Sequence, residues 1–359
     1  MNAIVLIFAA IIIMEEDIKE DNQEELYERH SFRVDKGQQP FRVDKWVQSR
    51  IENITRNKIQ QAIDAGFLTV NGKEVKSNYK VKPGDEILLL SFVNPVQTEV
   101  QPEDIPLNIV AEDDAILVLN KPPNMVVHPG VGNYTGTLLN GIAYHLLSQN
   151  PALTEETLPR YGLVHRIDKN TTGLLVVAKT AEAAASLARQ FFDHSVVREY
   201  VALVWGNVEN DSGTIVAHVG RHQRFRKMFD AYPEGESGKH AVTHYEVIER
   251  FNYVTLVKCR LETGRTHQIR VHMKSIGHTL FNDAEYGGDK ILKGTIYSKY
   301  KQFVENCFEV CPRCALHAKT LGFEHPVTRE RLFFESALPA DMQNVIEKWR
   351  HYTAHRNSL

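Results

Sequence analysis

The feature that most constrains the fold is a series of short apolar runs in the last two thirds of the chain. Six such runs, rich in valine, leucine and other strand-forming residues, lie at 115–122, 174–180, 199–206, 213–220, 242–250 and 253–262. Each has the length and composition of a strand, and the last two flank a Phe251-Asn252 turn that predicts a hairpin. The segments 181–195 and 267–277 have helical patterns. Because strands outnumber helices and partly follow one another, residues 105–359 are predicted to form an α+β domain with a mixed, largely antiparallel sheet flanked by helices and loops.

A second, smaller unit is predicted over residues 41–92. Val43 and Val47 begin a helical pattern, and a second short helix is expected around Ile59. The stretch "FLTVNGKEV" predicts a hairpin with its turn at Asn71-Gly72, and Pro83-Gly84 predicts a turn before a last strand. This small α/β module is separated from the larger domain by a linker over residues 93–104.

The chain before the module has two unusual parts. Residues 3–14 are almost wholly apolar, but twelve residues are fewer than the roughly 20 that a membrane-spanning helix needs. Three interpretations stay open: residues 1–13 precede a true start at Met14, they form a buried segment, or they anchor the chain to a membrane. Residues 15–28 contain eight acids and one lysine, so residues 1–40 are expected to form an acidic, mobile arm.

The net charge of −3 conceals a basic module, because residues 41–90 contain nine Lys and Arg against six acids. The basic side chains of this module could line one surface and contact phosphates, or they could form an ordinary solvated face. They are Arg42, Lys45, Arg50, Arg56 and Lys58. Four cysteines in a chain of 359 residues do not suggest a disulfide framework, so a reducing, cytoplasmic location is expected.

The stretch "CFEVCPRC" has the C-x3-C-x2-C spacing of some iron–sulfur sites. With His317 as a fourth ligand it would also suit zinc. Only about 45 residues follow this stretch, which is too little chain for the barrel that usually accompanies such a cluster. We expect incidental cysteines, no metal and no cofactor.

The stretch "HRIDKNTTG" presents Asp168 in a local pattern that has two interpretations. Aspartate before Asn170 and Gly173 is common in turns, because Asp and Asn bond their own backbone. Alternatively, Arg166 projects to the same face of an extended segment and keeps the carboxylate ionised. An ionised carboxylate at the end of a strand can act as a nucleophile or a base.

Further candidates lie elsewhere in the chain. "LETGRTHQIRVHM" predicts a helix that begins near Thr266, with Arg270 and His267 on one face and Arg265 at the junction before it. Tyr200 lies in a predicted strand, where a tyrosine is usually a core residue but can also stack on a base. His128, in "KPPNMVVHPG", is expected to be structural.

Two family resemblances cover most of the chain. Residues 41–92 resemble the alpha-L (S4-like) RNA-binding domain. "KPPNMVVHPG", "HRIDKNTTGLLVVAKT", "REYVALVWG", "ETGRTHQIRVHM" and "ALHAKTLGFEHP" resemble, in this order, the RluA-type pseudouridine synthases. The arrangement of the two domains is similar to that of the RluD-like members that act on large-subunit ribosomal RNA. Asn124 stands where the family usually has glycine, and Thr279 and Asn282 where it has proline and glycine.

The second resemblance implies an isomerase that converts uridine in RNA to pseudouridine without a cofactor. It implies that Asp168 is the catalytic aspartate, that Arg270 pairs with it, that Tyr200 stacks on the target base and that Arg166 fills the space of the flipped base. We also expect substrate contacts from His165, Thr172, Arg265 and His267. A monomer acting on large-subunit ribosomal RNA is expected; transfer RNA and a non-catalytic role in RNA binding or ribosome assembly are the alternatives.

Overall fold

The computed structural model describes residues 27–51, 56, 59–60, 63, 68–92, 100–130, 132–155, 157–225, 228–295 and 297–357. They fall into two compact units, a smaller one whose described residues lie mainly between 27 and 92 and a larger one that contains Val100–His128 and Thr135–Leu359. The interpretations of the apolar start, the acidic residues before 27, the linker residues 93–99 and Lys58 fall outside the described residues. Within those residues, no helix is long and apolar enough to cross a membrane.

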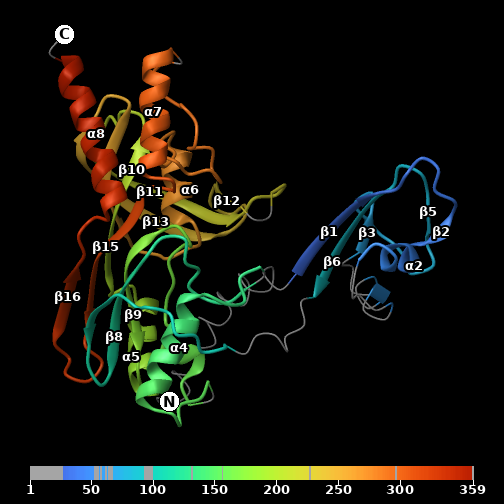
Figure 1. Ribbon diagram of the computed structural model, residues 1–359, viewed down its shortest axis with the longest axis horizontal. Helices are drawn as coiled ribbons and strands as arrows, with labels where there is room; N and C mark the ends of the chain where they lie inside the picture. Colours follow the sequence, from blue (N-terminus) through green and yellow to red (C-terminus); the bar gives the residue numbers. More distant parts are fainter. Residues whose placement is uncertain are drawn as a thin grey trace. The chain divides into compact units, whose positions relative to one another are not determined.

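The smaller unit is a short helix packed with two small sheets (Figure 1). Its elements are β1 (Tyr27–Arg33), β2 (Phe41–Arg42), α2 (Val43–Gln48), β3 (Leu68–Val70), β4 (Lys73–Glu74), β5 (Lys80–Val81) and β6 (Glu86–Phe92). The predicted hairpin is present as β3 and β4, and its turn residues Asn71 and Gly72 have φ of 53° and 75°. Val43, Trp46 and Val47 of α2 are buried in the core of this unit.

Strand β1 differs from the sequence interpretation, which placed its residues in a mobile arm. It pairs antiparallel with β6 from Tyr27 opposite Phe92 to Arg33 opposite Glu86. The physical reason lies in β6, which contributes Ile87 and Leu89 to the core and would otherwise end the sheet as an unpaired edge.

The larger unit is built on a ten-stranded sheet with the order β12-β11-β13-β14-β10-β15-β9-β8-β7, and β16 pairs with β15. The strands are β7 (Ile109–Glu112), β8 (Ile116–Lys121), β9 (Thr172–Ala178), β10 (Val197–Trp205), β11 (Ser212–Arg221), β12 (Phe229–Tyr232), β13 (Lys239–Arg250), β14 (Val254–Leu261), β15 (Leu316–Glu324) and β16 (Arg331–Glu335). Its helices are α4 (Leu138–Gln149), the 3-10 turn η2 (Pro159–Gly162), α5 (Ala181–Phe192), α6 (Gln268–Ser275), α7 (Ser298–Val310) and α8 (Ala340–Asn357).

The predicted α+β class and mixed sheet are confirmed. All six predicted strands are present, and β13 and β14 form the predicted hairpin, with Asn252 at φ 64°. Strands β15 and β9 are parallel, whereas the other strand pairs of this sheet are antiparallel among the described residues. The sequence interpretation did not identify α4, α7, α8, β15 or β16.

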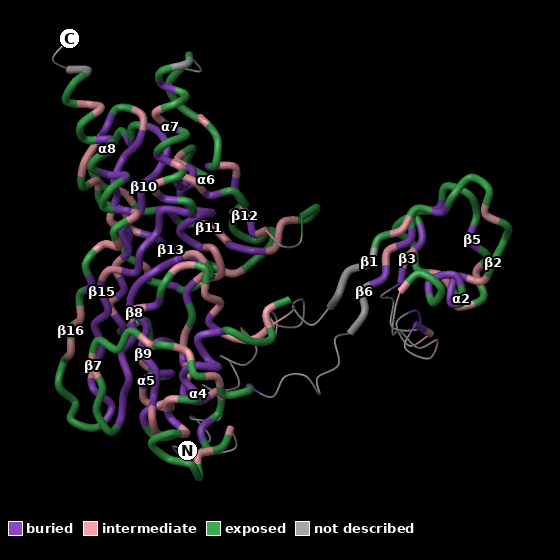
Figure 2. Tube along the Cα trace, in the orientation of Figure 1, coloured by how far each residue is buried: buried purple, intermediate pink, exposed green. Residues whose placement is uncertain are grey.

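The burial of β9 on both of its faces explains why its sequence is a continuous apolar run. All its residues are buried, because alternate side chains enter two different cores. Leu175 and Val177 pack with α4, and Leu174 and Val176 pack with α5. Figure 2 shows β8, β9 and β10 as the buried centre of this unit.

A third core lies where α7 and α8 cover β10 and β14. Trp205 of β10 and Trp349 of α8 are fully buried there, with ring centroids 6.3 Å apart. Cys307 and Cys311 of the "CFEVCPRC" stretch belong to this core and pack as small apolar residues. The C-terminal helix is therefore part of the scaffold behind strand β10.

The segment before Asp168 departs from the predicted strand–turn–strand. It forms only an isolated bridge, Leu163 to Val177, before the turn in which the Thr171 amide donates to the Asp168 carbonyl at 3.1 Å. Gly173, the second residue of β9, has φ 117°, and a Cβ there would lie 2.1 Å from the Ala318 carbonyl oxygen of β15. Glycine is required at this close approach, which sets where the Asp168 loop joins the sheet.

Candidate active site

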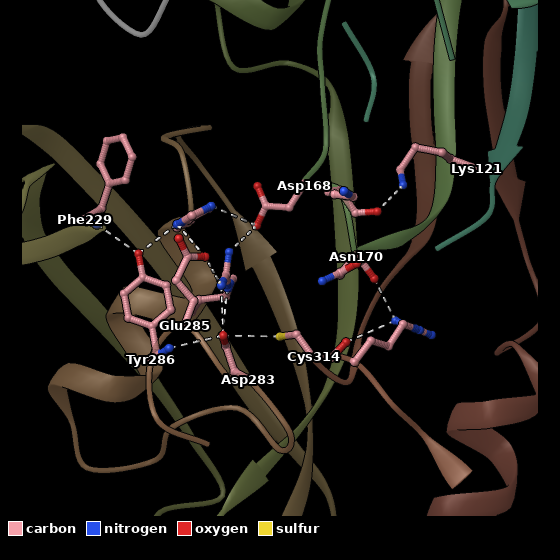
Figure 3. Close-up of polar contacts among 12 residues, drawn as sticks. Lys121, Asp168, Asn170, Phe229, Asp283, Glu285, Tyr286 and Cys314 are labelled. Carbon is pink, nitrogen blue, oxygen red and sulfur yellow. Dashed lines mark hydrogen bonds and ion pairs between the residues drawn. The ribbon is translucent and has the colours of Figure 1, made fainter. Parts of the chain in front are cut away.

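Asp168 lies on the loop that leads into β9, with its side chain 24% exposed (Figure 3). Its Oδ2 accepts a hydrogen bond from Arg270 Nη1 at 3.3 Å and lies 4.0 Å from His267 Nε2. These partners come from α6 and the residue before it, about 100 positions further along the chain. The fold thus joins two of the sequence motifs at one carboxylate that solvent still reaches.

Arg270 is buried and binds three carboxylates at once. It donates from Nε and Nη2 to both oxygens of Asp283, at 2.7 and 2.8 Å, and from Nη2 to Glu285 at 2.6 Å. Burial alone would lower the pKa of Arg270, but the bonds to Asp283 outweigh it and raise the pKa. Because the Asp283 side chain is only 2% exposed, the pair is a rigid fork that leaves Nη1 directed at Asp168.

The local charges keep Asp168 ionised. Burial would raise the pKa of its carboxyl, but His267, Arg270 and Arg166 together hold that pKa below the usual value. Burial also lowers the pKa of His267 itself, and Asp168 opposes that shift. The predicted pairing of Asp168 with Arg270 is present, and Arg166 is exposed on the same loop.

His267 is held by its neighbours in an uncommon backbone conformation. It is the residue before α6 and has φ 56°, in the left-handed region. Its Nδ1 is 2.8 Å from the hydroxyl of Tyr286, which also accepts the amide of Phe229 at 3.0 Å. Helix α6 therefore begins at Gln268, two residues later than Thr266, and the strain places the imidazole beside Asp168.

Two buried cations hold the backbone that follows Asp168. Lys121, at the end of β8, donates to the carbonyls of Pro122, Met125 and Lys169 at 2.8, 2.9 and 3.0 Å. Burial lowers the pKa of Lys121 to about 7 against the attraction of Asp168, whereas three carbonyl oxygens favour its charged form. The loop is therefore tied to β8 one residue after Asp168 (Figure 3).

Arg313 binds the next residue of the same loop. Its Nη1 donates to the Asn170 carbonyl at 2.9 Å, and its Nε and Nη2 bind Asp341 of α8 at 2.7 and 3.0 Å. Sequence reasoning missed Lys121, Arg313, Asp283 and Glu285 as site residues. Only Lys121 has a local signal, as a charged residue directly after an apolar run.

Several predicted site residues contact the scaffold. His165 Nε2 accepts the amide of Val176 at 3.0 Å, and Thr172 Oγ1 lies 2.8 Å from the ring of buried His317. Arg265 donates to the carbonyl of His240 at 3.3 Å. Tyr200 is buried on β10, where burial raises the pKa of its hydroxyl. Their predicted contacts with a substrate stay predictions.

The cysteines and the unusual asparagines have structural roles. Burial raises the pKa of Cys307 and Cys311 to about 12, and Cys314 donates to Asp283 at 3.4 Å. Over the part of the chain that the structure describes, no three His, Cys, Asp or Glu side chains are grouped as metal ligands. Asn124 and Asn282 have φ of 60° and 57°, a left-handed conformation that asparagine tolerates better than most residues.

In the smaller unit, four of the five predicted RNA-binding side chains are described. Arg42 and Arg56 both bind buried Asp44, at 2.9 and 3.0 Å. Burial would raise the pKa of Asp44, but the hydrogen bonds to its carboxylate outweigh burial and lower that pKa to about 2. Arg50 lies 3.6 Å from the centre of the Trp46 ring, and Lys45 is exposed. The pairing with Asp44 fixes two guanidinium groups that are still 39% and 41% exposed.

Lys121→Met is expected to lower the free energy of unfolding by about 3 kcal/mol, because three buried carbonyls each lose a donor at a cost of about 1–3 kcal/mol. Urea denaturation of the full chain measures this. The control is Lys179→Met, which removes a lysine paired with Glu112 near the surface and should cost less than about 1 kcal/mol. Equal losses in the two variants would contradict a specific role of Lys121.

Comparison with known proteins follows the same division of the chain. Residues 115–275 match the family model described as RNA pseudouridylate synthase, and residues 41–87 match the S4 domain. An uncharacterized RNA pseudouridine synthase of Chlorobaculum parvum is 47% identical, covering 88% of this chain and 96% of its own. The ribosomal large subunit pseudouridine synthase D of Pasteurella multocida is 39% identical, covering 89% and 94%.

A solved structure shows the same fold. The human RNA pseudouridylate synthase domain containing 4 protein aligns with a TM-score of 0.52 over 68% of this chain and 93% of its own. Its sequence identity is 21%, so the comparison concerns the fold. Both predicted resemblances are confirmed by these matches.

Proposed function

This chain belongs to the RNA pseudouridylate synthase family, and we propose that it isomerises specific uridines of large-subunit ribosomal RNA with Asp168 as the reacting carboxylate. Membership makes the protein an isomerase that acts on RNA. The choice of RNA is supported by the name of the Pasteurella relative and by the S4 domain over residues 41–87. The observation that carries the role of Asp168 is its ionised carboxylate, held by Arg270 and still open to solvent.

The reaction balances without any added group. The bond between C1′ and N1 of uridine breaks, the base turns, and C1′ bonds to C5. C5 then loses a proton, and N1 of the base gains one. Asp168 can capture C1′ as a retaining glycosidase carboxylate does, or remove a proton from the sugar. In either route it must be ionised, which its lowered pKa provides.

Access to the uridine requires base flipping. A stacked or paired uracil cannot reach a carboxylate inside the protein, and extrusion costs a few kcal/mol. Arg166 is exposed two residues before Asp168 and can fill the vacated space. Tyr200, near enough for Asp168 to affect its pKa, can stack on the flipped base. Arg265 and His267 are the nearest candidates for further substrate contacts from the start of α6.

The smaller unit is proposed to bind the RNA backbone. Arg42 and Arg56 share one carboxylate, so they retain net positive charge and a fixed geometry for phosphate. Lys45 adds an exposed ammonium, and Arg50 presents a guanidinium stacked on Trp46. These contacts are independent of sequence and would raise the affinity for any RNA.

Neutralising Lys45 and Arg50 in one variant, with glutamine at both positions, is expected to lower the salt slope of RNA binding by roughly 2, at about 0.9 per lost phosphate contact. Filter binding from low to high salt measures the slope. The paired surface cations Lys301 and Arg350 provide a matched double-glutamine control with an unchanged slope. If both double variants keep the wild-type slope, the two cations of the module do not meet phosphate.

The choice of substrate is tested with purified protein and unmodified transcripts of large-subunit ribosomal RNA and of transfer RNAs. Pseudouridine is detected by carbodiimide labelling and primer extension. We expect new pseudouridines in the ribosomal transcript alone. Conversion confined to transfer RNA would assign the enzyme to that substrate, and binding without conversion of any transcript would instead support a non-catalytic role in ribosome assembly.

A further inference from the structure

Arg198 of β10 is a buried arginine without an acidic partner among the residues that the structure describes. Its residue surface is 9% exposed, and its Nε has no hydrogen-bond partner among the described residues. Within the same described ranges, no carboxylate forms an ion pair with it, in contrast to Arg270 and Arg313. Burial accordingly lowers the pKa of Arg198, and the nearby Tyr200 opposes this only in part.

The Arg198 guanidinium lies 5.4 Å from the centre of the Phe191 ring and against the backbone of Gly264, where a Cβ would come within 2.7 Å of Nη1. Two carboxylates, Asp193 and Glu262, lie in the same region and act on the pKa of His194 together with Arg198. Among the described residues, these carboxylates are paired with Arg189 and His244 and not with Arg198.

An unpaired buried guanidinium is costly for the folded protein. A charge that leaves water without a partner loses its hydration, and an unmade hydrogen bond at a buried donor adds to that cost. The cation–π contact with Phe191 returns only part of this. The presence of such an arginine is accounted for if a bound anion accepts its unmade hydrogen bonds.

We propose that Arg198 binds a phosphodiester group of the RNA beside the target uridine. The proposal rests on the proposed function, in which Tyr200 stacks on the target base. Arg198 and Tyr200 are two residues apart and therefore share one face of β10, with Cα atoms about 7 Å apart. One nucleotide spans such a separation between its base and its phosphate, and Gly264 leaves room for the planar fork that phosphate prefers.

The first test is the salt dependence of RNA binding by full-length Arg198→Met protein. Methionine keeps much of the aliphatic volume and removes the charge. With a large-subunit ribosomal RNA fragment as probe, the slope should fall by about 0.7–0.9, the contribution of one phosphate contact. The matched control is Arg350→Met, which removes an arginine already held by Glu249 and should leave the slope unchanged. An unchanged slope in Arg198→Met overturns the proposal.

The second test separates phosphate binding from a structural role. Without RNA, Arg198→Met should unfold about 2–4 °C higher than wild type, because a buried unpaired charge has been removed. With RNA at a fixed excess, the difference in unfolding temperature should shrink or change sign, because binding stabilises wild type more than the variant. A lower unfolding temperature of the free variant, with a parallel loss of binding at every salt concentration, would show a structural role and overturn the proposal.

The third test locates the phosphate. Neutral methylphosphonate linkages are placed singly on each side of the target uridine. At one position, the substitution should weaken binding by wild type but not further weaken binding by Arg198→Met. If the losses of affinity from the methylphosphonate and from Arg198→Met are additive at every position, the proposal is overturned. If wild type binds the RNA without forming pseudouridine, the proposed function fails. The salt slope of binding and the non-additivity of Arg198→Met with the methylphosphonate still decide whether Arg198 binds phosphate.

Discussion

Asp168→Asn protein is expected to form pseudouridine roughly 10⁴-fold more slowly than wild type or not at all, the scale of loss when a reacting group is removed. Asparagine has the shape of aspartate and its Oδ1 still accepts the bond from Arg270 Nη1. Its amide, however, neither captures C1′ nor removes a proton at neutral pH. Single-turnover assays with saturating protein on a ribosomal RNA fragment measure the chemical step without the influence of product release.

The controls for Asp168→Asn are binding and folding. Arg270 keeps Asp283 and Glu285, so the unfolding temperature should change by only a few degrees. RNA affinity should equal or exceed that of wild type, because one negative charge has been removed from the site. Glu305→Gln, which removes an exposed carboxylate paired with Lys301 on α7, should retain full activity. An Asp168→Asn protein with wild-type single-turnover rates would contradict the assignment.

The second large effect is expected at Arg270. Arg270→Met leaves Asp283 buried and unpaired and removes the bond to Asp168 and Glu285. Removal of one partner from a buried pair costs about 3–5 kcal/mol, so urea denaturation should show a loss of this size. The double variant with Asp283→Asn should recover part of that stability without recovering activity, because Asp168 still lacks its cation.

Arg270 also determines the pH range of activity. In wild type, the cations outweigh burial, so Asp168 ionises below its usual pKa of 3.8 and its contribution to stability is lost only as the pH falls through that lower value. In the double variant, burial is opposed only by His267 and Arg166, and the pKa of Asp168 should rise. The acidic limb of the single-turnover profile should then move to higher pH. An unmoved limb would show that Arg270 does not control the ionisation of Asp168.

The fold was predictable where one strand or helix carries its own pattern. Strands β8, β9 and β10 have apolar runs whose two faces are both buried, and the Asn71-Gly72 turn specifies its hairpin locally. Helices α7 and α8 were not predicted, because their apolar residues are interrupted by many charged ones and become buried only against β10 and β14. The pairing of β1 with β6 likewise depends on a partner over 50 residues away.

The site was predictable to the extent that its residues lie in recognisable motifs. Asp168 and Arg270 were identified, and the structure brings them together. Lys121 and Arg313 were not, because their function is to bind backbone carbonyls at positions 169 and 170, which no local pattern encodes. The ring of His165, close to Asp168 in sequence, accepts a backbone amide of β9, and its predicted substrate contact stays a prediction.

The most direct test of the central claim is pseudouridine mapping in cells whose only copy of this protein is wild type or Asp168→Asn. Carbodiimide labelling and sequencing compare every uridine of ribosomal and transfer RNA between the two strains. The account predicts that one or a few large-subunit uridines are modified with the wild type and unmodified with the variant, while all other sites are equal. Identical maps would contradict it.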